Sequence, residues 1–318
     1  MLAAALLVGC GTGSGAETPA TANHPAPAHK APPHLRDLTV ALAGWDAPPT
    51  AGMLMAEHRG YFADGGLEVL SLSPATPALS ILDVVDRSDE IGVAYGPQVL
   101  VAKHNDVPIT VVGSLIPRST AAMMWLKDSG VRGISDLKGK TIAIPGLRFQ
   151  EGFLRVLLLR AGLTLDDVTV KHVRNNLVSA LVSGRADAIF GGSWNVEAAM
   201  VESHGLDPII RPVTSFGFPK YEELVLVART DFASKQPQLV RQFISALARG
   251  TDAAVNNSGS VIDLIELSAE SNPESNRTAT RVGLERTLPM LSPSGQPSLE
   301  WEGRLASWMS ENGLFEAP

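Results

Sequence analysis

The chain contains a single cysteine, Cys10, among its 318 residues. One thiol excludes an internal disulfide bond and any metal site that needs two cysteines. Aromatic residues make up only 5% of the chain, and no apolar run approaches the ~20 residues that a membrane-spanning helix needs. Lys and Arg total 26 against 33 Asp and Glu, so the net charge is −7 and no basic stripe indicates a nucleic acid partner. The remaining composition is typical of a globular protein long enough for two domains.

The position of Cys10 predicts a lipid anchor. An apolar stretch, 1–8, leads through Gly9 to Cys10, and Leu7-Val8-Gly9-Cys10 resembles the lipobox of bacterial lipoproteins. That resemblance implies cleavage before the cysteine and attachment by lipid to the extracytoplasmic face of a bacterial cell membrane. A plain secretory signal and a cysteine without function are the alternatives. Because a secretory signal normally opens with Lys or Arg and none precedes Cys10, we expect the true start to lie upstream or the N-terminus to have been trimmed.

Residues 11–34 predict a disordered tether, since they are rich in Gly, Ala, Thr and Pro and show no hydrophobic periodicity. The tether contains His24, His29 and His34 at five-residue spacing. We expect these to be scattered linker residues rather than a metal-binding tract. No metal or cofactor site is predicted anywhere in the chain.

From Leu35 onward, short apolar runs alternate with helical patterns, which predicts mostly parallel sheets flanked by helices. The predicted strands are 38–43, 67–72, 90–95, 109–115, 141–144, 168–173, 188–190, 208–213 and 223–228. The predicted helices are 52–57, 78–87, 98–104, 151–161, 177–183, 195–203, 237–256, 258–268, 276–287 and 299–311. Because the alternation restarts near 133, we expect two lobes, 35–120 plus 225–318 and 121–224. A ligand would bind between them, at the carboxyl ends of the strands.

Four segments in this order resemble type II periplasmic binding proteins of the NMT1/THI5-like branch: 55–69, 133–146, 181–199 and 221–251. The resemblance covers roughly 35–291. It implies a two-lobed α/β fold with the ligand in the inter-lobe cleft, no enzymatic activity, and a membrane permease of the ABC importer class as partner. The implied ligand is a thiamine pyrimidine precursor, an aminopyrimidine. Riboflavin, nitrate, taurine and alkanesulfonates are alternative ligands, because relatives bind them.

The loop after the strand 188–190 is the strongest candidate site. Trp194 offers a ring face for stacking on a flat heterocycle, and Glu197 can accept a hydrogen bond from an exocyclic amine. A helix beginning near Asn195 would place Trp194 and Glu197, three residues apart, on one face. Asn195 is a further predicted ligand contact, and Ser193 or Asn195 would cap that helix. The alternative is that Glu197 merely complements the helix N-terminus.

Four further loops offer ligand contacts. Trp45 can stack on a heterocycle or pack in the core, and Tyr95 and Gln98 offer a hydroxyl and an amide after the third strand. Tyr221 precedes a return strand, and the resemblance implies a position near the cleft or hinge, with an ordinary surface loop as the alternative. Arg148, before a helix, would hold an anionic ligand if it points inward, while an outward-pointing Arg148 would fit a neutral ring better.

Two other classes of function compete with ligand capture. Fungal relatives resemble a pyrimidine synthase that uses a cysteine cluster and an active-site histidine, and the single cysteine here does not supply that cluster. No G-x-S-x-G, H-E-x-x-H or P-loop motif occurs either. A structural or signalling lipoprotein on the same scaffold is the third possibility, because a fold does not fix a function.

Overall fold

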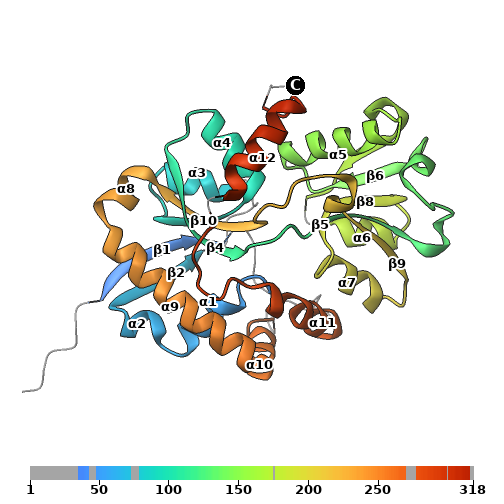
Figure 1. The fold of residues 1–318 in the computed structure, drawn as a ribbon. Helices are drawn as coiled ribbons and strands as arrows, with labels where there is room; N and C mark the ends of the chain where they lie inside the picture. Colours follow the sequence, from blue (N-terminus) through green and yellow to red (C-terminus); the bar gives the residue numbers. More distant parts are fainter. Residues whose placement is uncertain are drawn as a thin grey trace, which may run out of the picture. The chain divides into compact units, whose positions relative to one another are not determined.

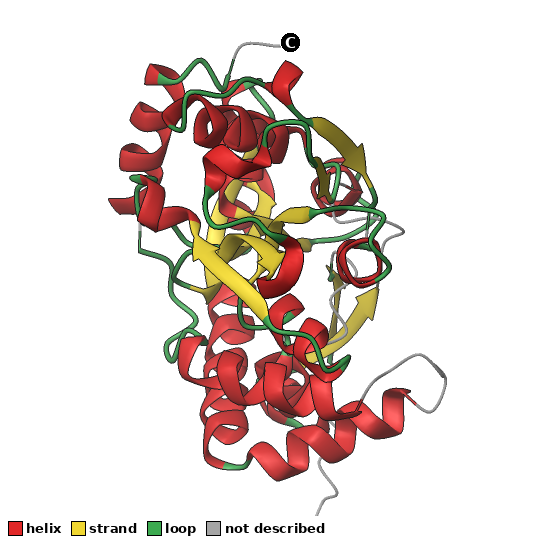
Figure 2. Ribbon diagram, turned by 90° about the vertical axis from the view of Figure 1, so that its right-hand side faces the viewer, coloured by secondary structure: helices red, strands yellow, loops and turns green. Residues whose placement is uncertain are grey.

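Ten strands form two five-stranded sheets in the computed structural model, which describes residues 35–42, 48–72, 79–174, 176–269, 277–298 and 300–315 (Figure 1). These residues belong to one compact unit, Leu35–Pro318. The predictions made for Cys10, for Trp45 and for the tether lie outside the described residues. Helices flank the strands on both sides (Figure 2).

The first sheet, called sheet A, has the strand order β2-β1-β3-β10-β4. Its strands are β1 (Arg36–Ala41), β2 (Leu67–Leu72), β3 (Ile91–Tyr95), β4 (Ile109–Ile116) and β10 (Leu224–Arg229). β1 pairs in parallel with β2 and β3, whereas β10 runs antiparallel to both β3 and β4. All five residues of β3 are buried, as expected for a central strand with both faces covered.

The second sheet, called sheet B, has the order β7-β6-β8-β5-β9. Its strands are β5 (Ala121–Leu126), β6 (Thr141–Ile144), β7 (Thr169–His172), β8 (Ala188–Ser193) and β9 (Pro208–Pro212). β6 pairs in parallel with β7 and β8, and β5 runs antiparallel to β8 and β9. In each sheet, therefore, four strands share one direction and one antiparallel strand sits between two of them.

Helices cover both sheets. Those of the sheet A side are α1 (Ala51–His58), α2 (Tyr61–Asp64), α3 (Leu79–Val85), α4 (Gly96–His104), α8 (Thr230–Lys235), α9 (Pro237–Asn256), α10 (Ser258–Ala269), α11 (Arg277–Thr287) and α12 (Glu300–Glu311). Those of the sheet B side are α5 (Arg148–Arg160), α6 (Leu177–Val182) and α7 (Glu197–Ser203). Five short 3₁₀ turns complete the described elements: η1 (Lys127–Ser129), η2 (Ile134–Leu137), η3 (Leu165–Asp167), η4 (Val213–Phe216) and η5 (Leu288–Met290).

The long helix α9 shows how the apolar pattern of the sequence becomes packing. Leu239, Phe243, Leu247 and Ala254 recur at helical spacing and are all buried. Phe243 stacks on Phe62 of α2, with ring centroids 5.3 Å apart. α9 also packs closely against α1. One stripe of a single amphipathic helix therefore fixes α1 and α2 beside sheet A.

All nine predicted strands are confirmed, with ends that differ by a few residues. The prediction missed β5, because its residues, Ala121–Leu126, were assigned to no element. It also began α7 too early: the helix starts at Glu197, with Val196 as its N-cap and no side-chain cap, so neither Ser193 nor Asn195 caps it. Residues 148–150, predicted to precede a helix, form its first turn.

Candidate ligand-binding site

The chain passes from sheet A to sheet B through residues 117–120 and returns through residues 213–223, which we call the first and the second crossing. The antiparallel strands β5 and β10 follow these crossings and begin at the carboxyl edges of the sheets. β10 begins opposite the last residue of β3, since Leu224 pairs with Tyr95. β5 begins opposite the last residue of β8, since Ala121 pairs with Ser193. The residues just before these two strands therefore lie where a ligand of a parallel sheet is expected.

The side chain of Glu223 connects the two crossings by hydrogen bonds. Its carboxylate accepts hydrogen bonds from the backbone N–H groups of Thr120 (2.6 Å) and Ala121 (3.0 Å), and its side chain is buried. Desolvation raises the pKa of Glu223, while these hydrogen bonds act in the opposite direction. The Glu223 carboxylate, at the end of the second crossing, is therefore held by backbone N–H groups at the end of the first crossing and the start of β5.

Glu197 faces the same region from sheet B. It is the first residue of α7, and its carboxylate accepts a hydrogen bond from the Ser193 N–H at 2.7 Å. Burial raises the pKa of Glu197 to about 7, and the negative charge of Glu223 adds to the effect. Glu197 does support the turn that precedes its helix. The pKa of its carboxyl group also lies close to neutral pH, so the group is partly protonated there.

Two tyrosines complete what we call the acidic cluster: Tyr95, Glu197, Tyr221 and Glu223. Desolvation raises the pKa of both phenols well above the ordinary value. The negative charges of Glu197 and Glu223 add to the shift of Tyr95, and that of Glu223 adds to the shift of Tyr221. Both phenols therefore stay protonated at neutral pH. The ring of Tyr95 also lies 5.8 Å from that of Phe149 in α5, so residues of the two sheet systems meet here.

The charges in the acidic cluster have one sign. None of the groups that shift the pKa values of Tyr95, Glu197, Tyr221 and Glu223 is a cation. Glu223 is buried and Glu197 is half-buried. Two such carboxyl groups without a cation among these neighbours favour a ligand that brings positive charge or N–H donors, and they repel an anion.

Three of the predicted contacts, Tyr95, Glu197 and Tyr221, lie together in the acidic cluster. Trp194 is half-buried and packs against a small core that includes Met124 and Leu177. It lies in the turn before α7 rather than in the helix, so helical spacing is the wrong reason for placing it beside Glu197.

The other predicted contacts lie differently. Asn195 is buried, and its side-chain amide donates to the Thr287 hydroxyl of α11 at 2.7 Å, so this group is committed to the protein. Gln98 is half-buried in the first turn of α4. Arg148 is exposed at the start of α5.

The sequence reasoning missed Glu223 and Thr120. The available signal was the pair Glu222-Glu223 directly before the apolar run Leu224–Ala228, since acids at the end of a buried strand need partners. Thr120 carried no signal of its own. Its hydroxyl donates to that of Ser193 (3.1 Å), and its carbonyl accepts from the Trp194 N–H (3.0 Å), which joins the first crossing to the Trp194 loop.

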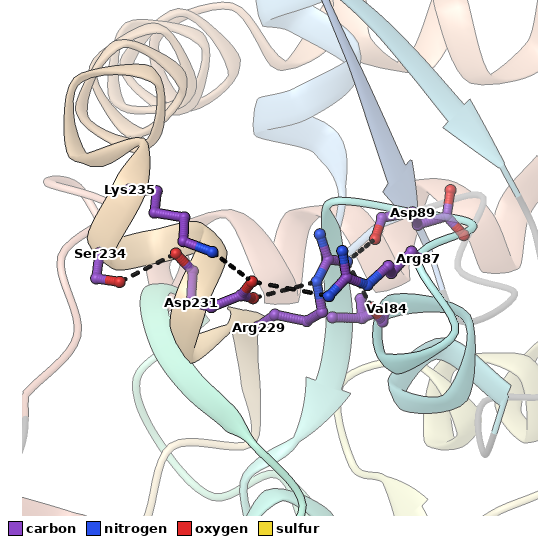
Figure 3. A network of polar contacts seen from close by, with 7 residues as sticks. All are labelled: Val84, Arg87, Asp89, Arg229, Asp231, Ser234 and Lys235. Carbon is purple, nitrogen blue, oxygen red and sulfur yellow. Dashed lines mark hydrogen bonds and ion pairs between the residues drawn. The ribbon is translucent and has the colours of Figure 1, made fainter.

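A dense ion-pair network lies at the opposite end of β10 (Figure 3). Arg229 donates to the carbonyl of Val84 (2.8 Å) and pairs with Asp231 (3.4 Å). Asp231 also pairs with Lys235 (3.2 Å) and, at 3.9 Å, with Arg87. Three cations share the single Asp231 carboxylate, and these contacts join the start of α8 to the end of α3, so the network holds both helices beside sheet A.

No group of three His, Cys, Asp or Glu side chains in the described ranges is arranged to bind a metal ion. No helix within the same ranges combines the length and the apolar character needed to cross a membrane.

Comparison with solved structures identifies the fold. The alkanesulfonate-binding protein SsuA from Xanthomonas axonopodis pv. citri, solved with bound MOPS, superposes with a TM-score of 0.69, covering 91% of this chain and 96% of that one at 18% identity. The predicted two-lobed α/β fold of periplasmic binding proteins is therefore confirmed.

Sequence comparison then gives the family. Residues 47–259 match the model of the NMT1/THI5-like family, and the chain belongs to that family. The formylaminopyrimidine-binding protein of Halalkalibacterium halodurans is 26% identical over 275 residues, covering 84% of this chain and 82% of the relative. The 4-amino-5-hydroxymethyl-2-methylpyrimidine phosphate synthase of Aspergillus parasiticus is 28% identical over 229 residues, covering 68% and 66%. The family thus includes proteins named for binding and for catalysis.

Proposed function

We propose that this chain is the extracytoplasmic ligand-binding component of an ABC importer and captures a small aminopyrimidine, a precursor of the thiamine pyrimidine. The ligand lies between the two sheets, at the acidic cluster. Its amino groups donate to Glu197 and Glu223, and the half-buried ring of Trp194 is available for stacking. The similarity to the formylaminopyrimidine-binding protein supports the ligand class.

The observation that carries the proposal is that the negative charge of Glu223 reaches Glu197 and raises its pKa, with no cation among the groups that shift the pKa of either acid. Aminopyrimidines present N–H donors and a basic ring nitrogen, which satisfy buried carboxyl groups. Hydrogen bonds from such a ligand offset part of the free-energy cost of burying the two acids.

Anions fit this region poorly. A sulfonate or nitrate would meet two carboxyl groups and no cation among the neighbours that shift their pKa values. The start of α5, the expected place for an anion, is already occupied, since the Gln150 side chain accepts from the Leu147 N–H at 3.4 Å. Arg148 is exposed there. Riboflavin, a larger flat ring system, remains the alternative ligand.

A thermal-shift titration tests the ligand class. The Cys10→Ser protein is mixed with formylaminopyrimidine, 4-amino-5-hydroxymethyl-2-methylpyrimidine, riboflavin, taurine and nitrate in turn. A ligand at 100 times its Kd should raise the free energy of unfolding by about 2.7 kcal/mol. We expect this rise with the aminopyrimidines, and a loss of affinity of about 10- to 100-fold in Glu197→Ala.

The matched control is Glu285→Ala, which removes an exposed carboxylate from α11 and should leave the affinity unchanged. A shift with riboflavin or an anion in place of the aminopyrimidines would contradict the ligand assignment. A loss of affinity in Glu285→Ala as large as in Glu197→Ala would contradict the site.

The proposed activity is binding, with no bond broken. Because a family member is named as a synthase, the purified protein should also be incubated with pyridoxal phosphate and iron and analysed for a pyrimidine product. Product formation would overturn this part of the proposal.

Membrane attachment through Cys10 is a separate part of the proposal. Radioactive palmitate should label the wild-type chain in a bacterial host, and Cys10→Ser should lose the label and leave the membrane fraction. A Cys10→Ser protein that keeps the label would contradict it.

A further inference from the structure

Helix α11 contacts the start of sheet B's helix α7, next to the proposed ligand site. α11 is connected to the sheet A side through α10, which packs on α9 and α1. α7 packs on β8 and β9 of sheet B. Figure 1 shows α11 beside α7. The α11–α7 contact therefore joins the helices of one sheet to those of the other.

A buried hydrogen-bond chain runs through this contact. The Asn195 amide donates to the Thr287 hydroxyl (2.7 Å), and that hydroxyl donates to the carbonyl of Gly283 one turn earlier (2.6 Å). Asn195 and Thr287 are 2% and 0% exposed. The direction of both bonds is fixed, since Thr287 uses its proton on Gly283 and only its oxygen is left to accept.

An ion pair lies beside the chain. Arg286 of α11 and Glu202 of α7 approach to 2.7 Å, and each side chain is about one-third exposed, at 32% and 36%. A Cβ at Gly283 would lie 3.6 Å from the Asn195 carbonyl oxygen, an ordinary van der Waals distance, so α11 lies against this loop. The contact thus combines a buried hydrogen bond and a half-buried ion pair.

Asn195 occupies the centre of the loop that carries Trp194 and Glu197. We propose that α11 latches this loop, with Thr287 as a positioning residue that sets the ligand-contacting side chains and with Arg286–Glu202 reinforcing the contact between the two sheet systems. The inference rests on the proposed function for its ligand, but the latch itself does not depend on which ligand binds.

The energetic consequence follows from population arithmetic. If only the latched arrangement holds Trp194 and Glu197 in place, the apparent Kd equals the intrinsic Kd divided by the latched fraction. Removing the Thr287 hydroxyl leaves the Asn195 amide buried without its acceptor, which lowers that fraction. Affinity should therefore fall although Thr287 is not proposed to touch the ligand.

Three variants separate the latch from general packing. Thr287→Val keeps the shape of the side chain and removes the oxygen, whereas Thr287→Ser keeps the oxygen. Glu202→Gln removes the charge that pairs with Arg286 at the surface, where misfolding is not expected. Glu285→Gln is the matched control, because Glu285 is an exposed acid on α11 whose partner, Arg281, lies on the same helix at 3.7 Å.

The first readout is the distance between the two sheet systems without added ligand. Spin labels are attached to cysteines introduced at Leu82 of α3 and Leu159 of α5, which are 52% and 51% exposed. The background is Cys10→Ser, which removes the one native thiol. We expect Thr287→Val and Glu202→Gln to broaden the distance distribution toward longer values, and Thr287→Ser and Glu285→Gln to match the parent protein.

The second readout is the Kd for formylaminopyrimidine. We expect a loss of about 5- to 10-fold in Thr287→Val, with Thr287→Ser recovering most of it. An unchanged distance distribution in Thr287→Val and Glu202→Gln would overturn the latch. A changed distribution in a protein that binds no pyrimidine would instead support the latch and overturn the proposed ligand. Equal effects of Glu285→Gln and Glu202→Gln on the distance distribution would also overturn the latch.

Discussion

At the scale of single residues, the carboxyl groups of Glu197 and Glu223 differ in how they are held. Glu223 accepts two backbone hydrogen bonds, from Thr120 and Ala121, whereas Glu197 accepts one such bond from another residue, Ser193. A carboxylate with fewer donors is less well compensated for burial. Glu197 therefore has the greater capacity left for a ligand's N–H groups.

The titration of Glu197 should appear in the pH dependence of stability. Its pKa is about 7 in the folded chain and near the ordinary 4.5 when unfolded. Between these values the folded state keeps a proton that the unfolded state has lost. The free energy of unfolding contributed by Glu197 is therefore fully present below pH 4.5 and is lost as pH rises through 7.

Glu197→Gln should flatten this profile, because the amide resembles the neutral acid and can still accept from Ser193. Urea unfolding of both proteins at several pH values between 4.5 and 8 measures the difference in slope, which is at most about 1.4 kcal/mol per pH unit. Glu285→Gln should follow the wild type. Parallel profiles for wild type and Glu197→Gln would show that Glu197 titrates at an ordinary pKa.

The sequence predicted Tyr95, Glu197 and Tyr221 because each follows or precedes a recognisable strand. It did not predict Glu223, whose role depends on two backbone N–H groups more than 100 residues away in the chain, at Thr120 and Ala121. It also assigned Asn195 to the ligand, since nothing local reveals the Thr287 acceptor on α11. Local patterns locate strand ends, but partners across the fold are a tertiary property.

At the scale of elements, the α1–α9 contact depends on two glycines. A Cβ on Gly250 of α9 would lie 2.1 Å from the carbonyl oxygen of Gly52 and 2.6 Å from the Ala56 Cβ. A Cβ on Gly52 would lie 2.3 Å from the Thr251 hydroxyl oxygen. The two helices therefore approach at the distance of their backbones, and a side chain at either position forces them apart.

Gly250→Ala should destabilise the protein although alanine is the better helix former. We expect a loss of about 1–3 kcal/mol from overpacking, measured by chemical unfolding. Gly303→Ala in α12 is the matched control, since nothing lies within 4 Å of a Cβ there, and it should stabilise by about 0.5–1 kcal/mol. A stabilising Gly250→Ala would show that α1 and α9 can separate at no cost.

Periodicity predicted nine of the ten strands but not β5, the antiparallel strand of sheet B. Its sequence, Ala121–Leu126, is a short apolar run without flanking helical pattern, and such a run does not distinguish strand from helix. The antiparallel direction of β10 was equally hidden, because direction is decided by pairing and not by the run itself.

At the scale of the whole molecule, α12 makes a second connection between the two sheet systems. Its start packs on α4, where Lys103 and Glu302 pair at 2.5 Å. Its end contacts α5, where the Arg155 guanidinium donates to the carbonyls of Asn312 (2.9 Å) and Gly313 (3.2 Å). α12 therefore spans from one system to the other (Figure 1).

Arg155→Ala should loosen this connection, because two carbonyls at the end of α12 lose their donor. We expect the free energy of unfolding to fall by about 1–2 kcal/mol, measured by chemical unfolding. Arg304→Ala on α12 is the control, since the Arg304 side chain is 58% exposed and its one ion pair, with Glu300, is long at 4.0 Å. Equal stabilities of Arg155→Ala and Arg304→Ala would argue against α12 as a connector.

The place of β10 between β3 and β4 has a consequence for the order of folding. Residues 224–229 are synthesised more than 100 residues after the end of β4, with all of sheet B in between. Until they emerge from the ribosome, β3 and β4 present unpaired edges to solvent, a state prone to aggregation. Sheet A must therefore finish after the segment that forms sheet B has been made, and closing so long a loop slows its completion.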